Sequence, residues 1–190
     1  MNVYDFDNTI YDGESTFDFF MFCLKKRKSL IKLLPPVVIT LIKYKRCKIS
    51  TDRLMKIGEK YMADFIFEIG DIQKLVSEFW DLHEHKIKDF YKKQQKEDDV
   101  IISASADFFL QQICNRLKIK YLIASKIDIK NGKIEYMCHG DVKVKLFYEH
   151  FPNKIVDEFY TDSKNDMPMI KIAKKAFLVK KNNISEYKFH

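Results

Sequence analysis

Apolar side chains recur along this chain at two spacings, which predict two kinds of structure. Between residues 14 and 96 they return every three or four positions, for example at Phe20 and Leu24. This spacing places them on one face of a helix. The segment therefore predicts a small bundle of helices, with a break at the proline pair 35–36.

The first residues and the chain beyond residue 98 contain short apolar runs that end in turn residues, which is typical of buried strands. The expected strands are 2–5, 100–103, 121–124, 158–161 and 176–179, the expected helices are 106–117, 142–150 and 167–174, and a hairpin is expected over 127–137 around Asn131-Gly132. Strands that alternate with helices favour a parallel α/β sheet. Residues 1–13 and 97–190 are thus expected to form an α/β core, with residues 14–96 as a helical insertion.

Composition indicates a folded chain with a basic surface. The 190 residues are 46% hydrophobic and 32% charged, and their net charge is +7. A positive surplus favours anionic partners such as phosphorylated metabolites, anionic lipids or nucleic acid, although a solvated Lys-rich surface also accounts for it. Nucleic-acid binding is not expected, because the lysines are dispersed along the chain and do not alternate with aromatic residues on one face.

Cysteine spacing and apolar runs bear on location. Cysteines stand at positions 23, 47, 114 and 138, without a CxxC pair or zinc-like spacing to histidine. We therefore expect reduced thiols of a cytoplasmic protein. No secretory signal is expected, since Asp5 stands where such a signal must be apolar. The apolar run 30–42 contains Lys32 and falls short of the roughly 20 residues that cross a bilayer, so peripheral contact is the membrane association left open.

Two carboxylates follow the first expected strand. Asp5 and Asp7 stand two positions apart, and in an extended chain such residues point the same way. They can therefore address one ligand at the carboxyl end of the sheet, where open α/β sheets bind ligands. Two like charges this close need a positive partner, and Mg²⁺ with its oxygen ligands is a natural one. The plainer interpretation is a pair of turn aspartates.

The pattern DxDxT after an opening strand resembles the first motif of the haloacid dehalogenase (HAD) superfamily. The resemblance implies a Rossmann-like parallel sheet with an inserted helical cap, and chemistry like that of phosphoserine phosphatases. It makes Asp5 a nucleophile that is transiently phosphorylated, Asp7 the general acid and base, and Thr9 part of the phosphate site. Asp7 favours a phosphatase over a dehalogenase, because chloride leaves without a proton whereas an alcohol gains from receiving one.

The second motif of the family requires a hydroxyl at the end of the next core strand. Ser103 ends the run Val100-Ile101-Ile102-Ser103. The resemblance implies that its hydroxyl and the N–H of Ala104 bind the phosphoryl oxygens. Ser105 competes for this role, but its position before Ala106-Asp107 suits a helix N-cap better.

The third and fourth motifs supply a lysine and an acidic pair. The run 138–144 resembles the family's C-x-G-x-x-K-V segment, which selects Lys143 to neutralise the phosphoryl group and steady the nucleophile. Asp162 and Asp166 match a DSxxDxPM variant, with Thr161 where many relatives have Gly. The resemblance implies a Mg²⁺ ion held by Asp5, by the backbone carbonyl of Asp7 and by Asp162, with Asp166 just outside these ligands or acting through water.

The inserted segment bears on the substrate. Its position between the first two motifs resembles a C1-type cap, which closes over the site and selects the leaving group. Glu14 lies at the offset from Asp5 at which phosphoserine phosphatases place an acidic residue that meets the substrate ammonium group. A first-turn glutamate favoured by the helix dipole is the alternative. The expected substrate is a small phosphorylated metabolite that resembles phosphoserine or phosphoethanolamine.

Two other functions stay open. The order basic, apolar, basic over 25–28, 30–42 and 43–46 would suit an anionic membrane surface and a lipid phosphate monoester. Two amphipathic helices with solvated lysines explain the same pattern. The second alternative is a non-catalytic basic binding protein. It predicts a degenerate site, yet all the motif residues are present.

Overall fold

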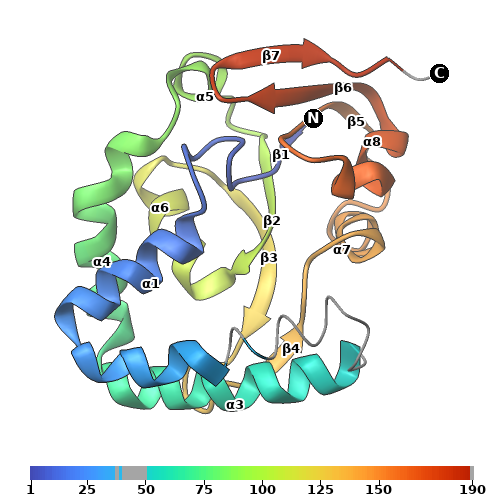
Figure 1. Ribbon diagram of the computed structural model, residues 1–190. Coiled ribbons are helices and arrows are strands. Elements are labelled where there is room, and N and C mark those ends of the chain that lie inside the picture. Colours follow the sequence, from blue (N-terminus) through green and yellow to red (C-terminus); the bar gives the residue numbers. More distant parts are fainter. Residues whose placement is uncertain (37–38, 40–50, 189–190) are drawn as a thin grey trace.

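One mostly parallel sheet runs through the molecule (Figure 1). The computed structural model describes residues 1–36, 39 and 51–188. Within this part the strand order is β4-β3-β2-β1-β5-β6-β7. The strands are β1 (Asn2–Tyr4), β2 (Val100–Ala106), β3 (Tyr121–Ile127), β4 (Ile134–Tyr136), β5 (Val156–Thr161), β6 (Ala173–Lys180) and β7 (Asn183–Glu186).

The pairing of the strands confirms the predicted α/β class. Strands β3, β2, β1, β5 and β6 are mutually parallel, and β1 lies at the centre between β2 and β5. The edge strands β4 and β7 are antiparallel to their neighbours. The predicted hairpin is present as the β3–β4 pair, and Gly132 in its turn has φ of 76°, a conformation that suits glycine.

Several strand boundaries, the end of one helix and one whole strand differ from expectation. β5 begins at Val156 and β6 at Ala173, before the expected starts at 158 and 176, and the helix expected over 167–174 therefore ends at Ile172. β2 continues to Ala106 and β3 to Ile127, so each runs three residues beyond the apolar run that predicts it. β7 has no counterpart in the prediction. All four of its residues are exposed, so it lacks the alternation of apolar and polar positions by which a half-buried strand is recognised.

Helices cover both faces of the sheet (Figure 1). They are α1 (Ser15–Lys26), α3 (Thr51–Ile69), α4 (Ile72–His83), α5 (Asp89–Gln94), α6 (Asp107–Arg116), α7 (Asp141–His150) and α8 (Met167–Ile172), with 3₁₀ turns η1 (Lys28–Leu33), η2 (Glu84–Lys86) and η3 (Lys164–Asp166). One buried cluster joins the sheet to α1, α4, α5 and α6, and a second joins it to α7 and α8. No described helix is long and apolar enough to span a bilayer.

The segment between β1 and β2 is helical, as its spacing predicts. It packs on the core through aromatic side chains, since the Trp80 ring stacks on Phe109 of α6 at 4.9 Å and the Phe19 ring lies 4.9 Å from the same residue. The indole N–H of Trp80 also donates to the Phe109 carbonyl at 2.9 Å. These contacts fix the base of the insertion against α6. The basic run 43–46 lies outside the described residues.

Candidate active site

The loop after β1 places Asp5 at the middle of the sheet edge. β1 pairs with both β2 and β5, and the Asp5 N–H extends the second pairing by donating to the Tyr160 carbonyl at 2.9 Å. Because the three strands are parallel, their carboxyl ends meet at this edge. The residues that follow β1, β2 and β5 are therefore brought together from positions near 5, 103 and 162.

A buried ammonium group joins two of the predicted site residues. Lys143 Nζ lies 2.8 Å from Asp5 Oδ1 and 2.8 Å from Asp166 Oδ1, and the lysine side chain is only 3% exposed. Lys143 projects from the first turn of α7, on the face of the sheet that α7 and α8 cover. An ammonium buried this deeply requires anionic partners, and the two carboxylates supply them.

Burial and charge shift the ionisation of these groups. Burial raises the pKa of Asp5 to about 7; Lys143 opposes this, whereas Asp166 and Asp7 add to it. Burial alone would lower the pKa of Lys143, but Asp5 and Asp166 outweigh it and hold the pKa above its usual range. The edge thus carries more carboxylate charge than a single lysine neutralises.

The Ser103 hydroxyl lies buried at the same edge. Ser103 pairs with Ala124 in the β2–β3 ladder and is 1% exposed, while the following Ala104 is exposed. Ser125 of β3 donates to the Ala104 carbonyl at 2.7 Å and accepts from the Cys138 N–H at 2.9 Å. Ser125 of β3 therefore holds the Ala104 carbonyl in place, while Ala104 itself is exposed to solvent.

Ser105 does not cap a helix, which corrects the sequence-based expectation. Ala106 is the N-cap of α6, and the Ser105 hydroxyl instead donates to Asp7 Oδ2 at 2.6 Å. The register of β2 against β3 shifts between Ser103 and Ala106, so Ser105 still belongs to the strand where an N-cap was expected. Such irregularities re-aim side chains beside functional sites, and no local sequence pattern announces them.

The structure also gives Thr161 a role that the sequence does not reveal. Its hydroxyl donates to Asp166 Oδ2 at 2.9 Å and accepts from the Ser163 N–H at 3.2 Å. Where a glycine would leave that carboxylate oxygen without this donor, the threonine fixes Asp166 against Lys143. The departure from the family pattern therefore has a definite structural consequence.

The remaining predicted residues surround this core. Asp162 is partly buried in the loop after β5, and burial, with Asp166 and Asp7, raises its pKa. Exposed Glu14 precedes α1 and accepts from the Asn8 amide at 2.6 Å; partial burial and then Asp7 raise its pKa. The buried Thr9 hydroxyl has no hydrogen-bond partner within the described residues.

The loop after β1, which carries Asp5 and Asp7, is held by hydrogen bonds from distant parts of the chain. Asn8 adopts a left-handed conformation with φ of 57°, and its N–H donates to the Gly13 carbonyl at 2.8 Å. Lys88, which is 7% exposed, donates to the Asn8 carbonyl at 2.5 Å and to the Lys181 carbonyl at 2.9 Å. One ammonium group therefore joins the loop after β1 to the turn between β6 and β7.

The side chains at this edge can serve a divalent cation, although they do not form a complete set of ligands by themselves. In the described part of the chain, no three His, Cys, Asp or Glu side chains gather as a metal cluster. Two carboxylates with one backbone carbonyl, completed by water and substrate oxygens, would suit Mg²⁺, which usually keeps several waters. The excess of acidic groups over Lys143 favours such a cation.

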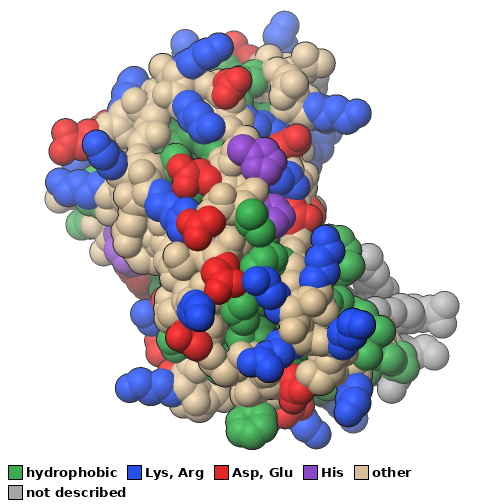
Figure 2. All heavy atoms as spheres, turned by 90° about the vertical axis from the view of Figure 1, so that its left-hand side faces the viewer, with side chains coloured by type: hydrophobic (Ala, Val, Ile, Leu, Met, Phe, Trp, Pro, Cys, Tyr) green, Lys and Arg blue, Asp and Glu red, His purple; other side chains and the backbone are tan. Residues whose placement is uncertain are grey.

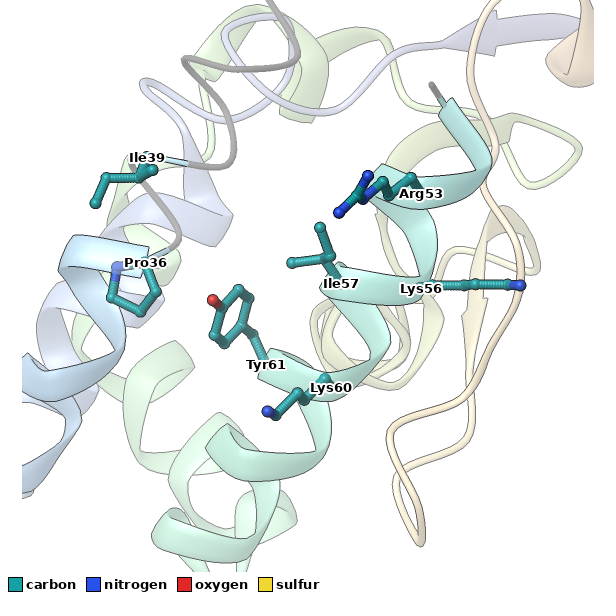
Figure 3. Close-up of a pocket in the computed structure, with 7 residues that line it drawn as sticks. All are labelled: Pro36, Ile39, Arg53, Lys56, Ile57, Lys60 and Tyr61. Carbon is teal, nitrogen blue, oxygen red and sulfur yellow. The ribbon is translucent and has the colours of Figure 1, made fainter. Parts of the chain in front are cut away.

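A separate groove lies in the helical insertion (Figure 3). It encloses about 490 Å³ and is lined by Pro36, Ile39, Arg53, Lys56, Ile57, Lys60 and Tyr61. Arg53, Ile57 and Tyr61 project from α3 toward Pro36, while Lys56 extends away along the outer side of the helix (Figure 3). Arg46, the other arginine of this region, lies outside the described residues.

The parallel sheet with helices on both faces and a lysine-paired acidic edge defines a Rossmann-like α/β core, and the sequence places it in a family. Residues 3–171 match the family model of haloacid dehalogenase-like hydrolases. The chain therefore belongs to this family, which confirms the predicted membership of the HAD superfamily. No curated protein matches the sequence.

Solved structures share the fold at low sequence identity. A protein of unknown function from Bordetella pertussis Tohama I superposes with a TM-score of 0.69 at 15% identity, over 93% of this chain and 87% of that one. A phosphoserine phosphohydrolase-like protein from Francisella tularensis subsp. tularensis SCHU S4 gives 0.55 at 16% identity, over 93% and 86%. A HAD family hydrolase from Salmonella enterica subsp. enterica serovar Typhi gives 0.56 at 13% identity, over 90% and 59%.

Proposed function

We propose that the protein is a Mg²⁺-dependent phosphomonoester hydrolase that acts through an aspartyl-phosphate on Asp5. The observation that carries this proposal is the Lys143 ammonium held between Asp5 and Asp166 at 2.8 Å from each. A buried cation beside a carboxylate at the open edge of the sheet can bind a phosphoryl group and steady the attacking oxygen. Both tasks involve only the phosphoryl group, which every phosphomonoester shares.

The metal would be held by the Asp5 and Asp162 carboxylates and the Asp7 backbone carbonyl. When bound, Mg²⁺ would neutralise phosphoryl charge and help to align the phosphoryl group with the nucleophile. Asp166 contributes differently, because it is engaged by Lys143 and Thr161. Its part is to keep Lys143 aimed at the site.

The chemistry proceeds in two displacements. A carboxylate oxygen of Asp5 bonds to phosphorus while the ester P–O bond breaks, and Asp7 gives a proton to the departing alcohol oxygen. Water then attacks the aspartyl-phosphate, Asp7 takes a proton from it, and inorganic phosphate leaves with Asp5 restored. The Ser103 hydroxyl, the Ala104 N–H and Lys143 would bind the phosphoryl oxygens, and Thr9 would support the loop that shapes their pocket.

The helices between β1 and β2 are proposed to act as the cap, with residues 1–13 and 97–190 as the core. A small phosphorylated metabolite with an ammonium group would suit this arrangement, because Glu14 stands at the entry to α1 beside the Asp7 and Asp162 carboxylates. An ammonium group placed there would meet acidic side chains. Phosphoserine-like and phosphoethanolamine-like esters share this feature.

A lipid phosphate monoester is the second candidate, and the groove of the insertion favours it. Three cationic residues line that groove together with apolar ones. Large apolar side chains on the same insertion are exposed, among them Ile31 at 61% and Phe67 at 85%. On the face that carries α1 and α4, exposed apolar groups lie beside Lys and Arg in its lower half (Figure 2). Such surfaces suit anionic bilayers.

Hydrolysis of p-nitrophenyl phosphate with Mg²⁺ tests the proposal, with Asp5→Asn as the diagnostic variant. We expect the wild type to release nitrophenolate and Asp5→Asn to lose this activity. Asp98→Asn is the matched control, since Asp98 is exposed and should keep full activity. If Asp5→Asn hydrolyses the ester at the wild-type rate, Asp5 is not the nucleophile. An inactive wild type would favour a non-catalytic binding protein.

A further inference from the structure

We propose that Ser105 and Thr16 are positioning residues, which orient the Asp7 carboxylate through a chain of hydrogen bonds that begins on α1. This inference rests on the proposed function, because it assigns these residues to the proton transfers of Asp7. It adds to the motif residues two hydroxyl groups that no family motif contains in this sequence. A helix residue of the insertion, a strand residue of the core and the Asp7 carboxylate lie together, each hydrogen-bonded to the next.

Both oxygens of Asp7 have a donor from a different segment. Ser105 Oγ donates to Oδ2 at 2.6 Å, and the Ser15 N–H of α1 donates to Oδ1 at 2.6 Å. A carboxylate bound at both oxygens cannot rotate about its terminal bond without losing one of these contacts. The two donors therefore set the plane of the Asp7 carboxylate, and with it the free lone pairs to which a proton can attach.

The direction of the chain follows from the chemistry of its members. Ser105 Oγ lies 2.9 Å from Thr16 Oγ1. An ionised Asp7 only accepts, so the single proton of the Ser105 hydroxyl goes to Asp7, and Thr16 must donate to Ser105. The sequence of donation is Thr16 to Ser105 to Asp7. Ser105 is 8% exposed, so few water molecules compete for its hydroxyl, whereas Thr16 is exposed.

The same serine is also tied to the phosphoryl-binding part of the edge. The Ser105 N–H donates to Ser103 Oγ at 3.1 Å. Ser105 therefore has two contacts at the edge. Its backbone N–H bonds to Ser103, whose hydroxyl is expected to bind phosphate, and its side chain bonds to Asp7, the expected proton donor. Because Ser15 and Thr16 open α1, the N-terminus of that helix and the end of β2 hold Asp7 jointly. Loss of either contact frees one carboxylate oxygen.

The diagnostic experiment compares two substrates of nearly equal shape, p-nitrophenyl phosphate and phenyl phosphate. Nitrophenolate leaves readily without a proton, whereas the more basic phenolate benefits from one. Single-turnover release of the phenol isolates the first displacement from hydrolysis of the aspartyl-phosphate. General acids contribute roughly 10²–10⁴-fold, so misplacing Asp7 should remove part of that factor from the phenyl ester only.

For Ser105→Ala we expect release of phenol to slow by about 10-fold or more, as part of that general-acid factor. Release of nitrophenolate should change far less. Thr16→Val should show the same selectivity more weakly, and Thr16→Ser should restore the wild-type ratio because it keeps the hydroxyl. An equal loss with both esters, or no loss, would overturn the positioning role.

A crystal structure of Ser105→Ala provides a readout that does not depend on activity. We expect the Asp7 carboxylate to leave its wild-type orientation or to occupy several. If Asp7 keeps one orientation with its Ser15 contact intact, Ser105 does not position it. An inactive wild type would refute the proposed phosphatase, while this structural comparison would still decide whether the hydrogen-bond chain holds Asp7.

Discussion

Thr161 donates a hydrogen bond of 2.9 Å to the Asp166 carboxylate, on the oxygen that also accepts from Lys143. Thr161 is fully buried and Asp166 is 6% exposed, so water cannot easily replace this donor. In such surroundings the loss of a hydrogen bond to a carboxylate costs about 1–3 kcal/mol, even though Lys143 still bonds to the same oxygen. The threonine thus stabilises the geometry from which Lys143 reaches Asp5.

The first prediction follows directly. Thr161→Val removes the hydroxyl while keeping the shape of the side chain, and should lower both the free energy of unfolding, by about 1–3 kcal/mol, and the turnover number. Thr161→Ser should retain both, because it keeps the donor. Urea unfolding and steady-state kinetics of the two variants check this. A valine variant with wild-type turnover would show that Asp166 holds Lys143 unaided.

The second prediction concerns Lys143 itself. Lys143→Met leaves two carboxylates buried without their cation, and removal of one partner from a buried ion pair costs about 3–5 kcal/mol. We expect a large fall in stability and loss of phosphatase activity. Lys145→Met is the matched control, because Lys145 is 74% exposed and should behave as the wild type does. Comparable losses in both variants would contradict the assignment of Lys143.

The third prediction is a pH dependence of stability from a residue remote from the proposed reaction. Burial raises the pKa of Asp99, at the start of β2, to about 6. The folded state therefore binds the proton more tightly than the unfolded state, for which a pKa of about 3.9 is usual. Between these values stability falls as the pH rises, and the cost is fully present above pH 6.

Asp99→Asn removes this cost and keeps an acceptor for the Lys96 N–H, which now bonds to Oδ2 at 2.8 Å. The variant should gain more stability over the wild type at pH 7.5 than at pH 4.5. Urea unfolding at both pH values measures the difference, and the shared residues cancel in the comparison. An equal difference at the two pH values would mean that Asp99 is ionised throughout.

The fourth prediction tests the groove of the insertion. The double variant Arg53→Glu with Lys60→Glu reverses two of the charges that line it. If the groove serves an anionic bilayer, the wild type should float with phosphatidylglycerol vesicles and not with phosphatidylcholine vesicles, and the double variant should lose this binding. Lys174→Glu with Lys175→Glu, on exposed positions of β6, controls for net charge. Equal loss in both pairs would exclude a specific groove.

The sequence predicts which residues meet at one edge of the sheet, although it places the ends of β2 and β3 three residues too early, because parallel strands in an α/β fold present their carboxyl ends at one edge. That rule brings Asp5, Ser103 and Asp162 to one region from distant positions. Lys143 forms an ion pair with Asp5, the residue that the sequence proposes as the nucleophile. Strand direction is enough to bring the three strand ends together, whereas the choice of Lys143 on α7 depends on the resemblance of residues 138–144 to a family motif.

Other features depend on contacts that no local pattern encodes. Ser105 contacts Asp7 only because β2 shifts its register against β3 after Ser103. Read locally, the same serine looks like a helix cap, since it precedes an apolar helix. The contact between Thr161 and Asp166 likewise depends on how the chain turns after β5. Tertiary placement decides these residues, and the linear spacing does not.

Lys88 links the edge hairpin of β6 and β7 to the loop after β1. Residues after 171 lie beyond the match to the family model, yet the Lys181 carbonyl shares an ammonium with the Asn8 carbonyl. The closing turn of the chain thereby braces the loop that begins it. Substitutions in this tail would change how firmly the loop after β1 is held, and would thereby affect the proposed phosphatase reaction without altering any motif residue.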